Sequence, residues 1–176
     1  QSQLEPHMLF NTLANLRVLI GVDPPRAQAM LDRLIAFLRA TLNASRSTLH
    51  PLATEFERVA DYLALMDMRM GSRLQTQLSL PPDLRELGVP PLLLQPLVEN
   101  SIKHGLEPQI AGGRIEVSAR RDGNLLVLSV HDSGVGLGAS VASGDTHFGL
   151  QQVRERLRTL YGNRAGLELQ DAIGGG

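Results

Sequence analysis

The chain has 176 residues, of which 43% are hydrophobic and 20% are charged, and its net charge is −1. This composition is ordinary for a globular protein of one or two domains, and the charge balance gives no footprint for nucleic acid or an anionic membrane. The absence of cysteine excludes disulfides, thiolate catalysis and Cys-ligated zinc, and no apolar run reaches the roughly 20 residues that span a bilayer.

The first part of the chain predicts a helical hairpin. Residues 1–20 form an expected helix whose apolar positions cover about half of its circumference, which suits a helix inside a bundle. A break at 21–25 precedes a second helix at 25–43 with its own apolar stripe. Because two helices cannot bury such wide apolar faces alone, we expect a homodimer in which two hairpins form a four-helix bundle.

The rest of the chain mixes helices and strands. Helical spacing of apolar residues predicts helices at 51–70, 91–106 and 148–161. Alternation and short apolar runs predict strands at 74–80, 114–120, 125–130 and 167–169, with a hairpin turn at 122–124. This order predicts an α+β fold, a two-layer sandwich with a largely antiparallel sheet. We therefore divide the chain into a hairpin domain, 1–45, and an α/β domain, 46–176.

The helix expected at 91–106 has an unusual polar side. At 100° per residue, one side is apolar and the other gathers Gln95, Glu99, Asn100, Lys103 and His104. The Asn100 carbonyl oxygen can ligate a hard cation, and Lys103 can reach a phosphate. The same residues also fit an ordinary solvated face with a Glu99–Lys103 pair one turn apart.

Two glycine-containing segments follow. Residues 132–136, D-S-G-V-G, come directly after an apolar strand. The carboxylate of Asp132 can accept a hydrogen bond from an amino group such as that of adenine, and the glycines let the backbone approach a ring closely. Residues 144–150 precede or open the last helix, a position suited to phosphate. Each segment taken alone also fits an ordinary turn.

The order of these three elements resembles the ATP-binding domain shared by histidine kinases, gyrase, Hsp90 and MutL. Residues 89–106, V-P-P-L-L-L-Q-P-L-V-E-N-S-I-K-H-G-L, and residues 3–13, Q-L-E-P-H-M-L-F-N-T-L, are similar to the LytS-type sensor histidine kinases. The resemblance covers essentially the whole chain. It implies a cytoplasmic kinase core cut from an inner-membrane sensor, with the sensor region and the final strand of the ATP-binding domain absent.

The resemblance also implies roles for single residues. His7 matches the phospho-acceptor histidine, and Glu5 and Glu99 are the candidates for the general base. The matching nucleotide positions are Asn100 for Mg²⁺, Lys103 and His104 near the phosphates, Asp132 for the adenine amino group, Gly134 and Gly136 beside the base, and Gly149 and Leu150 in a lid. Two positions depart from common family patterns: Met8 follows His7 where many other histidine kinases have an acid, and His147 lies where many have a glycine.

The implied activity is that of a two-component sensor. The chain would bind ATP and Mg²⁺, phosphorylate His7 and pass the phosphoryl group to an aspartate in the receiver domain of a response regulator. Nucleic acid is not an expected partner. Two other functions fit the same nucleotide residues: a dimeric ATP-binding regulatory module without phosphoryl transfer, and an ATP hydrolase of the gyrase and Hsp90 type in which Glu99 orients water.

Overall fold

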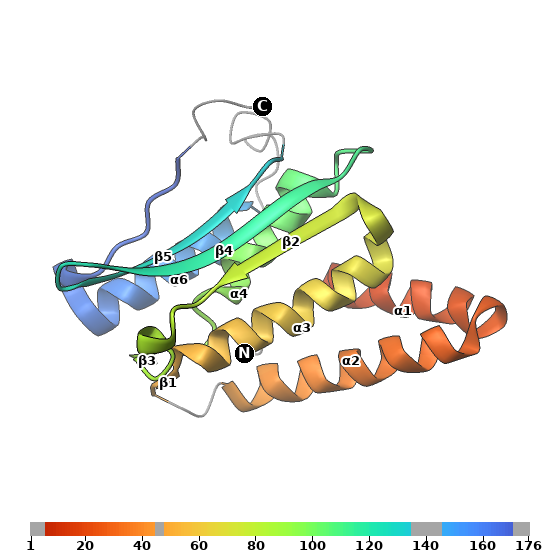
Figure 1. The fold of residues 1–176 in the computed structure, drawn as a ribbon, viewed down its shortest axis with the longest axis horizontal. Helices are drawn as coiled ribbons and strands as arrows, with labels where there is room; N and C mark the ends of the chain where they lie inside the picture. Colours follow the sequence, from red (N-terminus) through yellow and green to blue (C-terminus); the bar gives the residue numbers. More distant parts are fainter. Residues whose placement is uncertain (1–5, 45–47, 135–145, 171–176) are drawn as a thin grey trace.

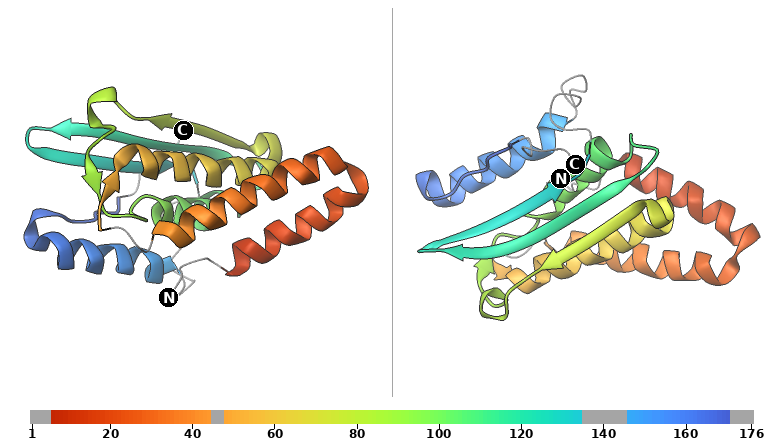
Figure 2. Two further views of the ribbon diagram at one scale, coloured as in Figure 1. Left: turned by 90° about the horizontal axis from the view of Figure 1, so that it is seen from below. Right: turned by 45° about the horizontal axis from the view of Figure 1, so that its top comes forward.

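The computed structural model describes residues 6–44, 48–134 and 146–170, with side chains described for 8–42, 48–134 and 150–170 (Figure 1). The fold is α+β, as predicted. A mixed three-stranded sheet is covered on one face by helices, and a helical hairpin lies beside the first of them (Figure 2). No helix within these ranges is long and apolar enough to cross a membrane.

The predicted hairpin is present. Helix α1 (Pro6–Val22) and helix α2 (Pro24–Ala44) run antiparallel and meet at a sharp turn. The break is shorter than the predicted 21–25, because the Asp23 side chain accepts a hydrogen bond from the Arg26 backbone N–H at 3.2 Å and so caps α2. The first turn of a helix accepts proline, because the N–H groups there have no partner within the helix. Pro24 and Pro25 therefore begin α2 instead of breaking it.

Helix α3 (Leu52–Met70) connects the hairpin to the sheet. It ends at Met70, as the range predicted from the sequence did, and the following Gly71 adopts a φ of 65°. On one side α3 packs against α2, where the buried rings of Phe37 and Tyr62 have centroids 5.8 Å apart. Just before α3, the short strand β1 (His50–Pro51) pairs antiparallel with β3 (Gly88–Val89).

The main sheet has the order β2-β4-β5. Strands β4 (Gly113–Asp122) and β5 (Leu125–Asp132) form the predicted hairpin, with Gly123 at a φ of 57° in its turn. Strand β2 (Leu74–Ser79) instead pairs parallel with β4. The expectation of a largely antiparallel sheet was therefore wrong, because the helices between β2 and β4 carry the chain back as a crossover.

Three helical segments complete the covered face. These are α4 (Gln95–Asn100), the π-helical segment η3 (Ser101–Leu106) that continues it, and α6 (Thr146–Tyr161). Figure 2 shows α3, α4 and α6 on the same side of the sheet. The alternation predicted for β4 is confirmed, since Ile115, Val117 and Ala119 are buried against these helices. The strand predicted at 167–169 was wrong: residues 165–170 have no regular structure.

Candidate functional site

The helix predicted at 91–106 begins later and winds differently than expected. Residues 91–94 are not helical, and regular α-helix extends only from Gln95 to Asn100. The chain then widens into η3, where the Glu107 backbone N–H donates to the Ile102 carbonyl oxygen at 2.8 Å, five residues back. Such π-helical turns within α-helices are frequent at functional sites. The polar residues of this stretch are thus divided between a regular and a widened turn.

Except at Gln95, the burial of residues along this helix agrees with the predicted division into an apolar and a polar side. Val98, Ile102 and Leu106 are fully buried, whereas Glu99, Asn100, Lys103 and His104 are half-buried. Gln95 is the exception, because only 3% of it is exposed and its Nε2 donates to Glu99 Oε1 at 2.8 Å. The Glu99 carboxylate is therefore held from the preceding turn.

The end of β5 packs directly against this helix. Asp132 is the last residue of β5, and its Oδ1 accepts a hydrogen bond from the Gly134 backbone N–H at 2.9 Å. A Cβ atom added to Gly105 would lie 2.5 Å from Asp132 Oδ1, and one added to Gly134 would lie 2.4 Å from the Gly105 carbonyl oxygen. Residues 105 and 134 must therefore be glycine for the helix and the strand end to approach so closely.

The chemistry of this corner suits a purine nucleotide with a divalent cation. A carboxylate has about four acceptor positions, so Asp132 can bind a ring amino group while it holds Gly134. Ser133 fixes the backbone here, because its N–H donates to the Arg114 carbonyl at 3.0 Å and its Oγ accepts from the Arg114 N–H at 2.9 Å. Asn100 offers one carbonyl ligand, which fits Mg²⁺, an ion that keeps several waters and shares phosphate oxygens.

The other predicted site residues are placed less completely. Glu5 and Gly136 lie outside the described residues. His7 and Gly149 lie in helices α1 and α6, in turns whose side chains are not described, and Leu150 is buried in α6. In both views of Figure 2, the N-terminal end of α1 points toward the start of α6, whereas the α1–α2 turn lies at the far end of the molecule.

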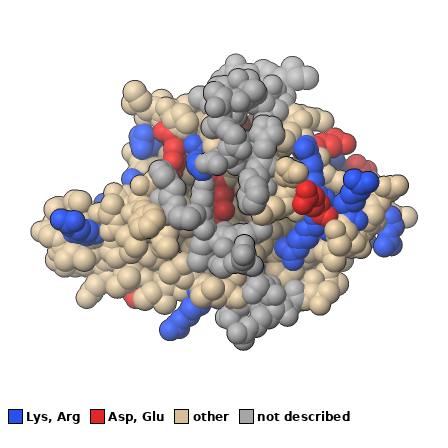
Figure 3. Space-filling model, turned by 180° about the vertical axis from the view of Figure 1, so that it is seen from behind, with Lys and Arg blue, Asp and Glu red and all other residues tan. Residues whose placement is uncertain are grey.

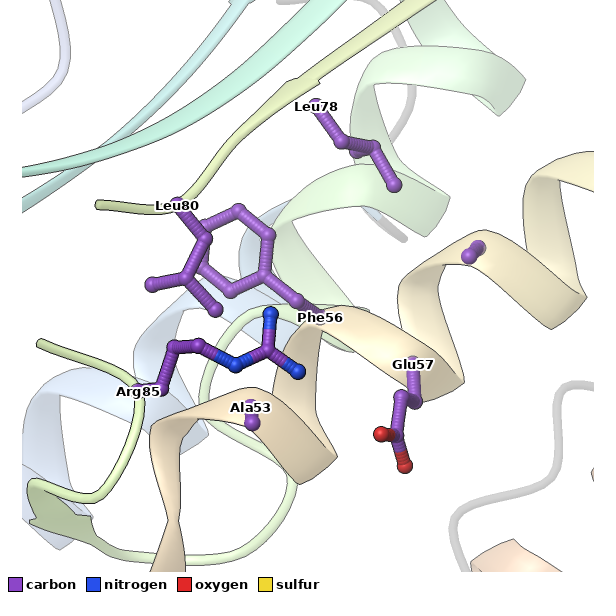
Figure 4. A pocket seen from close by; sticks show the side chains of 7 residues that line it. Ala53, Phe56, Glu57, Leu78, Leu80 and Arg85 are labelled. Atoms are coloured by element: carbon purple, nitrogen blue, oxygen red, sulfur yellow. The ribbon is translucent and has the colours of Figure 1, made fainter. Parts of the chain in front are cut away.

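A shallow groove elsewhere on the molecule is separate from this corner. It lies between α3 and the end of β2, and it is lined by Ala53, Phe56, Glu57, Leu78, Leu80 and Arg85 (Figure 4). None of the sequence-predicted site residues lines it. We therefore assign the candidate site to the corner of Gly105 and Asp132, together with the polar side of α4 and η3 that carries Asn100.

Sequence reasoning missed two charged residues that hold the segment before α4. Glu55 lies on the apolar face of α3, and Arg156 lies beside the apolar stripe of α6. Glu55 is only 1% exposed, and Arg156 donates a hydrogen bond to the Pro91 carbonyl oxygen. The available signal was a carboxylate one helical turn from Leu52 and Val59, on the side of α3 that should be apolar.

Comparison with known proteins places the chain in a family. The family model described as histidine kinase matches residues 1–74. The chain is 36% identical over 169 residues to sensor histidine kinase BtsS of Escherichia coli strain K12, and the aligned region covers 96% of this chain and 29% of BtsS. It is 31% identical over 180 residues to sensor protein LytS of Staphylococcus haemolyticus strain JCSC1435, and this alignment covers 97% of this chain and 31% of LytS.

A second LytS sensor protein, from Oceanobacillus iheyensis, is 31% identical over 183 residues, covering 97% of this chain and 31% of that protein. The chain thus spans about three-tenths of the length of these curated relatives. Because the family model covers the start of the chain and the relatives cover nearly all of it, the chain belongs to the LytS-type histidine kinases.

Proposed function

We propose that this chain is the kinase core of a two-component sensor. It binds ATP and Mg²⁺, phosphorylates His7 and transfers the phosphoryl group to an aspartate of a response regulator. The observation that carries the proposal is the close approach of Gly105, Asp132 and Gly134 beside the half-buried polar side of α4 and η3. Membership of the histidine kinase family supports the use of ATP.

Each site residue has a definite role in this proposal. Asp132 accepts the adenine amino group, and Gly134 and Gly136 lie beside the base. Asn100 holds the cation, while Lys103 and His104 lie near the phosphates and Gly149 and Leu150 close over them. Mg²⁺, when bound, neutralises charge that develops on the phosphate oxygens. Positioning by the chain therefore supplies most of the rate enhancement.

The acceptor step is carried by His7. A neutral imidazole nitrogen attacks the γ-phosphorus, the new N–P bond forms as the bond to the ADP oxygen breaks, and the imidazole gives up its proton. Glu5 and Glu99 are the candidates to accept that proton. The direction of α1, whose N-terminal end points toward the start of α6, supports His7 as the acceptor.

The proposed architecture has two domains and a twofold partner. Residues 1–45 form the dimerising phospho-acceptor hairpin, and residues 46–176 form an ATP-binding sandwich of the histidine kinase, gyrase and Hsp90 type. Support for a homodimeric four-helix bundle comes from large apolar side chains left exposed on both helices: Phe10, Leu13, Val18, Ile20, Val22, Leu31, Ile35 and Leu42. Figure 3, which shows the molecule from behind, has few Lys, Arg, Asp or Glu side chains over the hairpin end at the left of the view.

The printed names of the relatives, sensor histidine kinase and sensor protein, support a sensor region elsewhere in the full-length protein. We therefore place this chain on the cytoplasmic side of an inner-membrane sensor.

Incubation of the full-length protein with γ-labelled ATP tests the proposal. We expect an acid-labile label that is lost in His7→Gln. Asp132→Asn should weaken ATP binding by about 1.5–3 kcal/mol, because a charge-assisted hydrogen bond is lost. Asp122→Asn is the matched control, since Asp122 is exposed at the opposite end of the same hairpin.

Three results would contradict the proposal in different ways. A label that persists in His7→Gln would move the acceptor elsewhere. ATP binding without any label would favour a regulatory module that does not transfer phosphate. Steady phosphate release that His7→Gln does not change would favour an ATP hydrolase.

A further inference from the structure

We infer that Glu55 and Arg156 are positioning residues, which clamp the peptide between Pro91 and Leu92 and thereby fix helix α4 with Asn100 at its end. This inference rests on the proposed function of Asn100. Neither residue belongs to the predicted nucleotide site, and each acts through the segment 91–94 that precedes α4.

The Glu55 carboxylate binds three successive backbone N–H groups. Its Oε1 accepts from Leu92 at 2.8 Å, and its Oε2 accepts from Leu93 at 2.8 Å and from Leu94 at 2.9 Å. Successive N–H groups that converge on one anion form a backbone nest. Here the anion is supplied by α3, 37 residues before Leu92 in the chain, so the nest joins two separate helices.

The conformation at Leu92 depends on this anion. Leu92 is the only non-glycine residue with a positive φ in the described part of the chain, at 57°. A side chain in this region costs roughly 1–2 kcal/mol and persists only where the surroundings enforce it. The bonds to Glu55 supply that enforcement, because they turn the Leu92, Leu93 and Leu94 N–H groups toward one point.

Arg156 holds the other side of the same peptide group. Its Nη1 donates to the carbonyl oxygen of Pro91. This oxygen belongs to the same peptide group as the Leu92 N–H, which donates to Glu55. A peptide group is planar, so ligands on its oxygen and on its N–H fix its orientation. The clamp therefore links α3 and α6 through one peptide plane.

The surroundings of Glu55 keep its carboxylate ionised. His50 Nε2 lies 2.7 Å from Glu55 Oε1, and Arg58 Nη1 lies 3.7 Å from it. Burial alone raises the pKa of Glu55, but the contact with His50 and the N–H groups of Leu94 and Leu93 outweigh burial, so the net pKa is lowered. An ionised carboxylate is the form that can accept all three N–H groups.

The clamp acts on the site through a short, stiff path. Leu94 precedes α4, and its carbonyl oxygen accepts the N–H groups of Leu97 and Val98 at 3.0 and 3.1 Å. Asn100 lies six residues further on, about 9 Å along a helix. A rotation of the clamped peptide therefore changes the direction of α4 and moves Asn100 relative to Asp132.

The test compares ATP affinity with folding in variants of the full-length protein. Arg156→Ala and Glu55→Gln should each raise the Kd for a fluorescent ATP analogue about tenfold, once the folded fraction measured by circular dichroism is taken into account. Arg156→Lys, which keeps a donor at this position, should recover part of the loss. The matched controls Arg158→Ala and Glu57→Gln remove exposed charges from the same helices and should leave the Kd unchanged.

The Kd of the folded protein separates positioning from simple stabilisation. If both variants lower the melting temperature but bind the analogue like their controls, the positioning role is wrong. If Glu55→Gln does not fold, Arg156→Ala provides the test, because none of the three hydrogen bonds between Glu55 and residues 92–94 involves Arg156.

Asp132→Asn in the same assay separates this inference from the proposed function. If Asp132→Asn binds the ATP analogue more weakly while the Glu55 and Arg156 variants bind it like the wild type, only the positioning role is wrong. If Asp132→Asn binds the analogue with an unchanged Kd, both the positioning role and the proposed nucleotide site are wrong.

Discussion

Gly105 lies against the carboxylate of Asp132, so closely that a Cβ at residue 105 would stand 2.5 Å from Asp132 Oδ1. Real side chains do not tolerate this distance, and Oδ1 is already held by the Gly134 N–H at 2.9 Å. The relationship joins the polar helix to the end of β5. It also makes the corner sensitive to a single methyl group.

Gly105→Ala should therefore displace the Asp132 carboxylate. We expect a loss of stability of about 1–3 kcal/mol from overpacking, and weaker binding of ATP because the acceptor for the adenine amino group has moved. Isothermal titration with a non-hydrolysable ATP analogue and thermal unfolding measure the two effects. Gly134→Ala should be more severe, since its Cβ would lie 2.4 Å from the Gly105 carbonyl oxygen, which belongs to the backbone.

Gly21→Ala is the matched control for this pair. Gly21 lies in α1 with nothing within 4 Å of an added Cβ, so alanine should be neutral or slightly stabilising there. A Gly105→Ala protein with the stability and affinity of Gly21→Ala would show that residue 105 tolerates a side chain.

The sequence predicted what depends on local patterns. Alternation in β4, the end of α3 at Met70 and the turn at Gly123 were all confirmed, because each is a short-range effect. The non-helical segment 91–94 was missed because its conformation depends on Glu55, far away in the chain. Apolar spacing cannot reveal such a partner.

The same limit applies to the sheet and to the site. The parallel pairing of β2 with β4 follows from where the crossover helices pack, not from either strand. Asp132 and Asn100 were predicted as site residues because their motifs are local in sequence, and these roles stay predictions. The contact of Gly105 with Asp132 was not predicted, because at 100° per residue Gly105 falls on the apolar side of an ordinary helix, away from the polar residues.

The stability of the protein should fall in acid because of Glu55. Its pKa in the folded protein lies below the ordinary value of 4.5, so the folded state favours the ionised carboxylate. That contribution is fully present above the ordinary pKa and is lost as the pH falls through the lowered one. Urea unfolding of the wild type and Glu55→Gln should therefore give a stability difference that shrinks from about pH 5 downward.

The other ionisable groups that contact Glu55 among the described residues are His50 and Arg58. Glu57→Gln, an exposed change on the same helix, should show no such difference. A wild-type advantage over Glu55→Gln that stays constant down to about pH 3 would contradict a lowered pKa at Glu55.

The backbone at Leu92 gives an unusual order of stability. With a φ of 57°, Leu92→Gly should be more stable than Leu92→Ala by roughly 1 kcal/mol, because only glycine adopts this region without steric cost. Both variants lose the same half-buried side chain to within one methyl group, so the comparison isolates the backbone. Chemical unfolding of the two proteins measures it.

Leu93 provides the control for this comparison, because its φ is not positive and its side chain is also half-buried. Leu93→Gly should be less stable than Leu93→Ala, the usual order. The same order at Leu92 would mean that the strained conformation does not exist in solution.

The exposed apolar face of α1 should control self-association. Ile20 is 61% exposed and lies among other exposed apolar residues of the hairpin. Ile20→Glu places a charge where the proposed four-helix bundle would bury it, and it should weaken self-association at least about tenfold. Its effect on the unfolding of the isolated chain should be small, because an exposed side chain loses little on substitution. Sedimentation over a concentration series measures the association. Gln28→Glu adds the same charge at an exposed polar position of α2 and should leave the dimer unchanged. An Ile20→Glu protein that associates as strongly as the wild type would place the dimer interface elsewhere.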